Sequence, residues 1–395
     1  MKKRLVGIFI FIVVCIGVTF AQEAPKAEWN VLKPPFPLST VSIDTEETTW
    51  SSLDVTPDGK RFFFDMLGDI YVVDIEGGEA KALTQDYSWD IQPAVSPDGS
   101  KIAFISGRDG IANIWTMNLD GTNLKQISKE KQNIIHSPKW SPDGEYIVAT
   151  KGIMSSRSIP AGEIWMYHRS GGGGIAIKRR ANGRRDQKNI ADPVYSPDGK
   201  YIYWTQDTTP GSTFSYNRDP LKSIFAIIRY DLQKGREEFF TNGTGGAIVA
   251  TPAPDGKSVA FISRVRNKTV LFTKDLETGD ETPLYTEMER DMQEGFGSEG
   301  YYAYFDWTPD GKNIVFWTGG KFHKLSVADK SVKPIPVRVK AELKFADAVR
   351  FPVDVAPDDF NIKLVRWAQK SPDGKTIIFQ SLGKLYKRDL ASGKT

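Results

Sequence analysis

Apolar and polar residues alternate in short runs along most of the chain. Residues 102–105 form a short apolar run, and in residues 113–119 apolar side chains stand at positions 114, 115, 117 and 119. Alternation over four to eight residues predicts a half-buried β-strand. The runs are separated by turn-forming residues, and the 35 Gly and 23 Pro of the chain provide for many turns. The pattern predicts an all-β fold built from short strands.

The tripeptide Pro-Asp-Gly recurs seven times, beginning at Pro57, Pro97, Pro142, Pro197, Pro254, Pro309 and Pro372. An extended run enters each copy and an alternating run leaves it, as in residues 91–105, which predicts a β-hairpin. Pro fixes φ at one turn position, Asp bonds to the following backbone, and Gly adopts the positive φ that closes the turn. A second turn follows within the repeat, as at Asp120-Gly121, so each repeat supplies four strands.

The spacing of the repeats predicts a β-propeller. Successive copies lie 40 to 63 residues apart, and the shortest interval suits a four-stranded blade. We therefore predict an all-β, seven-bladed propeller of four-stranded antiparallel blades over residues 46–395. The seventh repeat supplies only three strands before Thr395. Either Ser39–Ile43 completes this last blade as its fourth strand, or the blade is left incomplete.

Residues 1–21 have the pattern of a secretory signal peptide. Lys2, Lys3 and Arg4 precede an apolar run of 16 residues that ends beside the small residue Ala21. The run is short for a membrane span, so cleavage is expected. Residues 22–45 then form an extended segment, and the mature bacterial protein is expected in the periplasm or outside the cell, without a stable membrane span.

Removal of this segment changes the charge of the protein. It takes three of the 52 basic residues and none of the 49 acidic ones, which leaves 49 of each. A neutral chain lacks the basic excess that nucleic-acid binding requires, so nucleic acid is excluded as a partner. The single cysteine, Cys15, lies in the signal segment, so the mature chain has no disulfide, thiolate metal site or cysteine nucleophile.

The sequence offers no constellation for catalysis. The three histidines, His136, His168 and His323, fall in different repeats and form no His-x-His pair. A Gly-x-Ser-x-Gly nucleophile motif is absent, and Gly171–Gly174 lack the Lys-Ser/Thr of a phosphate-binding loop. We expect no catalytic residue, no metal site and no cofactor.

The loops predict two unlike faces of the propeller. The Pro-Asp-Gly turns and the second turns of the repeats lie on one face, because they join strands one to two and three to four. The extra residues fall in the remaining loops, at residues 151–163, 178–189, 206–223 and 287–300. Long loops on a rigid scaffold are where binding usually resides. We expect a plain face and an inserted-loop face, with neutral insertion as the alternative for the second.

One of these insertions is strongly basic. Its six basic residues, set against one acidic residue, are Lys178, Arg179, Arg180, Arg184, Arg185 and Lys188. Such a cluster concentrates positive potential in an otherwise neutral protein. We predict that this loop binds an acidic partner surface, a carboxylate-bearing substrate or anionic envelope components. A solvated loop without a binding role is the alternative.

The repeats resemble those of TolB-like propellers, relatives of the WD-repeat class. Trp140-Ser141-Pro142-Asp143-Gly144 and Tyr195-Ser196-Pro197-Asp198-Gly199-Lys200 match the repeat hallmark in full. Thr56 and Thr308 replace the Ser in two copies and Ala253 replaces it in a third. The resemblance covers about residues 46 to 395 and implies a propeller fold.

A narrower resemblance concerns residues 50–80 and 351–386. These segments are similar to the propeller that precedes the catalytic barrel in large exported bacterial amidohydrolases. The resemblance implies a parent hydrolase acting on C–N bonds, whose metal-dependent barrel carries a His-x-His motif. That motif is not present in this chain.

The sequence therefore favours a non-catalytic exported propeller. Through its inserted-loop face it would bind a protein, a peptide or a downstream catalytic domain. A free-standing TolB-like periplasmic interaction protein is the alternative. A third class is an enzyme that uses the propeller pore. The scarcity of histidine argues against it, although paired carboxylates would supply catalytic groups.

Overall fold

The computed structural model describes residues 30–156, 160–215, 218–219, 221–241, 243–295, 297, 300–346 and 353–395. The predicted signal peptide lies outside them. The described residues form β-strands and one short 3-10 helix, Gly183–Arg185, with no α-helix among them. The chain divides into two compact units, Met1–Ala346 and Asp347–Thr395. The all-β prediction is confirmed.

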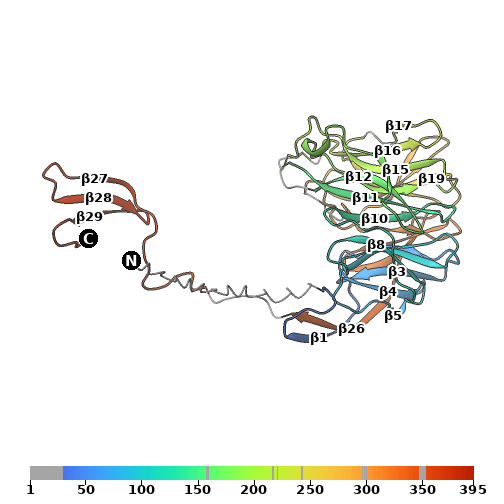
Figure 1. The fold of residues 1–395 in the computed structure, drawn as a ribbon. Coiled ribbons are helices and arrows are strands. Elements are labelled where there is room, and N and C mark those ends of the chain that lie inside the picture. The colour runs from blue at the N-terminus through green and yellow to red at the C-terminus, as the bar shows by residue number, and fades with distance from the viewer. Residues whose placement is uncertain are drawn as a thin grey trace, which may run out of the picture. The chain divides into compact units, whose positions relative to one another are not determined.

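The first unit contains six blades, each with four antiparallel strands in sequence order (Figure 1). The first three blades are β2 to β5 (Leu53–Val55, Arg61–Met66, Asp69–Asp74, Gly78–Ala82), β6 to β9 (Asp90–Val95, Lys101–Ser106, Asn113–Asn118, Lys125–Gln126) and β10 to β13 (Ile134–Trp140, Tyr146–Met154, Pro160–His168, Ile175–Lys178). The next three are β14 to β17 (Ile190–Tyr195, Tyr201–Asp207, Phe225–Asp231, Arg236–Phe239), β18 to β21 (Ala247–Pro252, Ser258–Val265, Lys268–Asp275, Glu281–Tyr285) and β22 to β25 (Asp306–Trp307, Asn313–Thr318, Lys321–Ser326, Val332–Ile335).

The ring closes directly between the sixth blade and the first. Leu53 N donates a hydrogen bond to Tyr304 O at 3.1 Å. The rings of Phe62 in β3 and Phe322 in β24 pack edge to face with centroids 5.1 Å apart, inside one continuous apolar core. These contacts leave no gap for another blade. The ring therefore has six blades, one fewer than the repeat count predicts.

The seventh repeat folds as a sheet of three strands in the second unit. Its strands β27 (Arg366–Lys370), β28 (Thr376–Ser381) and β29 (Lys384–Asp389) are antiparallel. Of the two outcomes predicted for this repeat, the incomplete blade is the one observed. Each repeat specifies a sheet through local turns, whereas the number of blades in the ring depends on which sheets pack together.

The N-terminal strand does not complete the last blade, so that prediction is wrong. Strand β1 (Leu38–Thr45) pairs antiparallel with β26 (Val337–Ala346), with Ile43 opposite Ala341. Strand β26 in turn pairs parallel with β5, so the first blade gains two outer strands beside β5 (Figure 1). The cause is the alternation in β26, whose Val337, Val339 and Ala341 are buried against the blade.

The recurring turn explains why the tripeptide is preceded by Ser or Thr. In the second blade, Ser96 Oγ donates to Asp98 Oδ1 at 2.6 Å and accepts from Lys101 N at 2.9 Å. Gly99 has φ +67° and donates its N–H to Ser96 O at 2.8 Å. The hydrogen bond from Ser96 is the main cause that lowers the pKa of Asp98. The motif is a hydrogen-bonded turn in which each residue has a structural role.

Candidate functional site

The basic loop runs from β13 of the third blade to β14 of the fourth, and includes the short helix Gly183–Arg185. Pairing of Lys101 with Asn118 confirms that the first and second turns of a blade share one face. The basic loop, which joins a fourth strand to the next first strand, therefore lies at the opposite face, as predicted. Its six basic side chains differ in burial and in the contacts that they make.

Three of the six basic residues are engaged in internal contacts. Arg180 is buried and donates from a guanidinium nitrogen to Asp186 O at 2.7 Å, with Glu163 3.5 Å away. Lys188 is buried and hydrogen-bonds to Thr209. Lys178 is half-buried, and its Nζ lies 2.6 Å from Glu237 Oε1. The sequence prediction treated all six alike, because these contacts depend on how the loop folds and on residues of other loops and strands, such as Glu163, Thr209 and Glu237.

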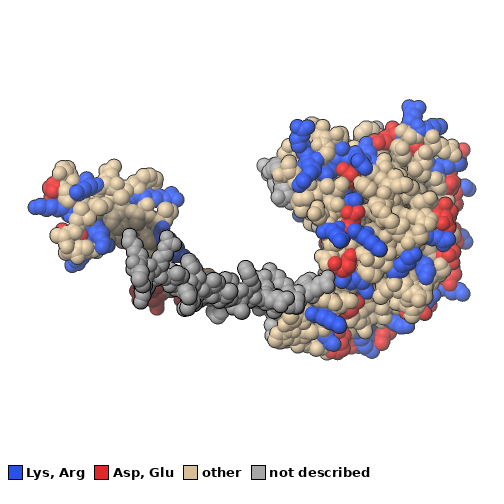
Figure 2. Space-filling view, viewed as in Figure 1, with Lys and Arg blue, Asp and Glu red and all other residues tan. Residues whose placement is uncertain are grey.

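The other three, Arg179, Arg184 and Arg185, are exposed. Among the described residues, none of them takes part in an ion pair. The Arg179 guanidinium lies 5.5 Å from the centroid of the Trp165 ring. Figure 2 shows Lys and Arg side chains gathered where Figure 1 draws this short helix in green. These three cations form the accessible part of the predicted site, and we call them the arginine cluster.

Neighbouring insertions hold the basic loop in place. Gln187 Oε1 accepts from Phe214 N at 3.0 Å, and Asn189 Nδ2 donates to the Tyr301 hydroxyl at 2.8 Å. Arg218 is buried and ion-pairs with Asp207 at 2.9 Å. These contacts join loops of the third, fourth and sixth blades. The described insertions therefore form a packed layer on this face rather than separate loops.

A second set of polar groups lines the pore, and sequence reasoning missed it. Five residues before each Pro of the motif, the first strand of four blades carries a bulge with a residue in the left-handed region; these residues are Gln92, Ser137, Asp192 and Val249, with φ of 54° to 59°. Non-glycine residues rarely adopt this conformation. Each of these residues donates its N–H to a side-chain oxygen of the preceding blade; the acceptors are Asp65, Gln92, Thr150 and Thr205.

The side chains at this level also bond across the pore. The Tyr304 hydroxyl donates to Asp192 Oδ1 at 2.6 Å, and Ser137 Oγ lies 3.3 Å from the same oxygen. Burial raises the pKa of Asp192, and burial and the Asp192 charge raise that of Tyr304. His136 is buried beside this network, and burial lowers its pKa to about 4. These groups link blades through the pore.

A charged group lies closer to the turns than this network. Its members stand three positions before the motif Pro, two residues after the bulge position. Lys139 Nζ is 2.5 Å from Asp54 Oδ1, and Asp306 Oδ2 accepts from Val55 N at 2.9 Å. Burial and the Asp54 charge raise the pKa of Asp306 to about 7, although Lys139 opposes this. For Lys139, the charges of Asp54 and Asp306 outweigh burial and raise its pKa. The three residues border a cavity of about 230 Å³.

The remaining histidines have different surroundings. His168 ends β12 and lies in an exposed turn, where its ring contacts Ser170. His323 stacks on Phe316 in the sixth blade. Within the described ranges, no group of three His, Cys, Asp or Glu residues is arranged to hold a metal ion. In the same residues, no helix is long and apolar enough to cross a membrane.

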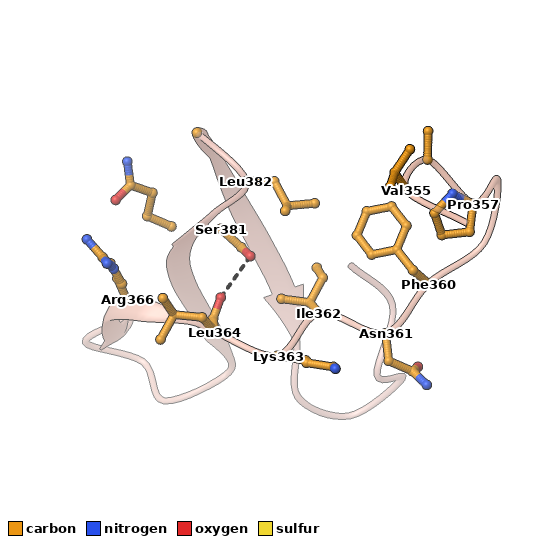
Figure 3. Close-up of a pocket in the computed structure, with 13 residues that line it drawn as sticks. Val355, Pro357, Phe360, Asn361, Ile362, Lys363, Leu364, Arg366, Ser381 and Leu382 are labelled. Atoms are coloured by element: carbon orange, nitrogen blue, oxygen red, sulfur yellow. Dashed lines mark hydrogen bonds between the residues drawn. The ribbon is translucent and has the colours of Figure 1, made fainter. Parts of the chain in front are cut away.

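The second unit has a cavity of its own, of about 680 Å³ (Figure 3). Phe360, Ile362 and Leu382 lie along it, and Ser381 Oγ donates to Leu364 O at 2.9 Å. The lining is largely apolar. No ionisable cluster of the kind seen in the pore occurs among its lining residues.

These features define a β-propeller. More narrowly, residues 43–168 match the family model of the TolB beta propeller domain, so the repeats are TolB-like as their motif predicted. A protein TolB homolog of Chlorobium chlorochromatii (strain CaD3) is 36% identical over 265 residues, which cover 60% of this chain and 53% of the homolog. The uncharacterized peptidase YuxL of Bacillus subtilis (strain 168) is 26% identical over 167 residues, 36% of this chain and 25% of that protein.

Solved structures show the same fold. TolB from Acinetobacter baumannii superposes with a TM-score of 0.54 and 19% identity, covering 74% of this chain and 66% of that one. The tricorn protease superposes with a TM-score of 0.52 and 15% identity, covering 87% of this chain and 30% of that one. The chain thus spans about half the length of its TolB homolog and a quarter of the peptidase.

Proposed function

We propose that this chain is a non-catalytic, exported propeller that binds an acidic protein or peptide partner through the arginine cluster. The observation that carries the proposal is that some basic residues of the loop are buried and others are exposed. Arg180 and Lys188 are buried and hold the loop, whereas Arg179, Arg184 and Arg185 remain exposed on it. Exposed cations on an anchored loop attract an anionic surface with little loss of loop entropy on binding.

Export is the part of this proposal that rests on residues 1–21. Their basic start, apolar run and small terminal residue are those of a secretory signal. The likeness to a TolB homolog supports an envelope location. The proposal places the mature protein in the periplasm or outside the cell.

We further propose that the propeller belongs to an amidohydrolase and contacts its catalytic barrel. Residues 50–80 and 351–386 support this through their resemblance to the propeller of such enzymes. The chain covers only 25% and 16% of relatives named as a peptidase and a protease, which supports a propeller that is part of a larger protein. Sequencing of the gene beyond codon 395 tests it: a His-x-His barrel is expected, and an immediate stop codon would favour a free-standing TolB-like interaction protein.

Binding is tested with a fluorescein-labelled decaglutamate peptide and the purified chain. Replacing Arg179, Arg184 and Arg185 with Ser is expected to raise the Kd at least fivefold, because each removes an accessible charge. The control replaces Lys60, Lys257 and Lys312, which are exposed beside the Pro-Asp-Gly turns on the plain face. The control has the same net charge as the test variant. Equal losses in both variants would show that net charge, and not this cluster, attracts the peptide.

A further inference from the structure

The three-stranded sheet of the seventh repeat has the same backbone bulge as the ring blades. Trp367 stands five residues before Pro372, the position of the bulge residue in four ring blades, and it is likewise left-handed with φ of 49°. The pairing of β27 with β28 shifts register between Arg366 and Gln369, as in those blades. In the ring, the N–H of each bulge residue donates to a side chain of the preceding blade. Because a left-handed tryptophan costs free energy unless its surroundings fix it, Trp367 indicates a neighbouring blade.

The seventh sheet also carries an acceptor for such a contact. In three ring blades the acceptor stands eight residues after the motif Pro; these acceptors are Asp65, Thr150 and Thr205. The seventh repeat has Gln380 at this position. A carboxamide can serve, because Gln92 Oε1 accepts from Ser137 N at 2.7 Å in the ring. Gln380 is half-buried, and its side chain makes no hydrogen bond with any described residue. Its oxygen is therefore available to a donor.

The seventh sheet exposes apolar residues at positions that the ring blades bury. Ile378 is 49% exposed. The residue at the same position in each ring blade is at most 1% exposed; these residues are Phe63, Ala103, Val148, Tyr203, Ala260 and Val315. Leu385 pairs with Gln380, so it shares a face with Gln380 and Ile378, and it is 78% exposed. Contiguous exposed apolar residues mark a surface of interaction.

The contact between the first and second ring blades shows how two such sheets fit together. Phe63 and Ile70 of the first blade pack in one apolar cluster with Ile102 and Phe104 of the second, and Asp65 Oδ2 accepts from Gln92 N at 2.6 Å.

Both sides of this contact have counterparts on the seventh sheet. Ile378, Gln380 and Leu385 stand at the positions of Phe63, Asp65 and Ile70, and we call them the acceptor face. Ile377, Phe379 and the Trp367 N–H stand at the positions of Ile102, Phe104 and the Gln92 N–H, and we call them the donor face. The acceptor face of one such sheet therefore fits the donor face of another.

We propose that the seventh sheet binds the seventh sheet of a second copy of this chain, acceptor face against donor face. The described ring blades do not offer these faces, because each packs on its neighbours through apolar clusters and the ring is closed. A second copy supplies both the Trp367 N–H and the Gln380 acceptor, and covers Ile378 and Leu385. Such a head-to-tail contact adds copies until a ring closes, so assemblies larger than a dimer are expected. The contact is independent of the proposed arginine cluster.

The first test is sedimentation velocity of residues 22–395 over a range of concentrations, which is expected to show reversible association. Replacing Ile378 and Leu385 with Asp should weaken association at least tenfold, because it places charges in an apolar contact. The control replaces Ile175 and Phe239 with Asp; both are 62% exposed, on β13 and β17, so it removes similar apolar surface and adds the same charge. This control should associate like the wild type. A wild-type monomer at every concentration, or equal losses in both variants, would overturn the proposal.

A second test uses milder substitutions and reports the geometry of the contact. Residues 22–395 contain no cysteine, so a disulfide can form only between introduced thiols. Ile378→Cys places a thiol on the acceptor face and Ile377→Cys places one on the donor face. Under mild oxidation by oxidised glutathione, a mixture of the two variants is expected to form a cross-linked heterodimer, whereas each variant alone should cross-link little. Equal cross-linking in either variant alone, or association without cross-linking in the mixture, as pairing through the edge of β29 would give, would contradict the proposal.

Discussion

Lys139 in the third blade forms an ion pair with Asp54 in the first, with Nζ 2.5 Å from Oδ1, although the second blade stands between them. The reach is possible because the second blade carries Ala94 at the equivalent position, three residues before its motif Pro. Asp306 of the sixth blade joins the pair at the same level. The polar pore thus connects blades that share no sheet.

Asp306 makes the stability of the propeller depend on pH. Burial first, and then the Asp54 charge, raise its pKa to about 7, while Lys139 opposes the shift. An unfolded Asp has a pKa near 3.9. The native state therefore holds more protons between these values, and the contribution of Asp306 to stability falls as pH rises from about 4 to 7.

Asp306→Asn should remove this dependence. Urea unfolding at pH 5 and pH 8 is expected to show that the variant gains about 1–2 kcal/mol relative to the wild type at the higher pH. His136 contributes equally to the free energy of unfolding of both proteins, so its contribution cancels in this comparison. Its effect has the opposite sign, because its pKa of about 4 favours the native state above pH 6.5. If the free energy of unfolding differs between variant and wild type by the same amount at both pH values, the raised pKa assigned to Asp306 is contradicted.

Ala253→Ser should stabilise the protein. The other turns have Ser or Thr at this position, and its hydroxyl bonds to the Asp of the turn, as Ser96 does to Asp98. Restoring this bond in the fifth blade is expected to add about 1 kcal/mol, or roughly 1–3 °C in Tm by calorimetry. The control Ala260→Ser buries a hydroxyl within β19 away from the turn and should destabilise. A lower Tm for Ala253→Ser would show that the turn does not accept the group.

Removal of residues 347–395 should leave the melting of the propeller within about 2 °C of the full chain. The ring closes through Leu53, Tyr304, Phe62 and Phe322, all of which lie in the first unit. A chain ending at Ile335 serves as the control, because it also loses β26 and exposes the edge of β5. We expect this control to associate and melt earlier. A loss of more than 5 °C in the first deletion would mean that the seventh repeat stabilises the ring.

The strands and turns could be predicted because their determinants are local. The alternation around Ser96–Lys101 and the bonds within that turn lie within a few residues of sequence. The blade count could not be predicted, because ring closure depends on distant contacts. One of them joins Phe62 to Phe322, 260 positions later in the chain. The partner of β1 was missed for the same reason, since β26 lies outside every repeat.

The site shows the same division. The positive charge of the basic loop is visible in the sequence, but the burial of Arg180 depends on Glu163 and Asp186, which only the fold brings to it. The pore residues carry a detectable signal. Aligning the repeats on Pro-Asp-Gly places Asp54, Lys139 and Asp306 at one position, where charged residues would face one another near the axis.

The most direct test of the proposed function is the salt dependence of decaglutamate binding. Because binding through exposed cations releases or replaces counterions, the logarithm of Kd should rise steeply with the logarithm of salt concentration. The variant with Arg179, Arg184 and Arg185 replaced by Ser should show a much flatter slope, with stability changed by no more than about 0.5 kcal/mol per site. The control variant at Lys60, Lys257 and Lys312 should keep the wild-type slope. An unaltered slope in the arginine variant would contradict binding through this cluster.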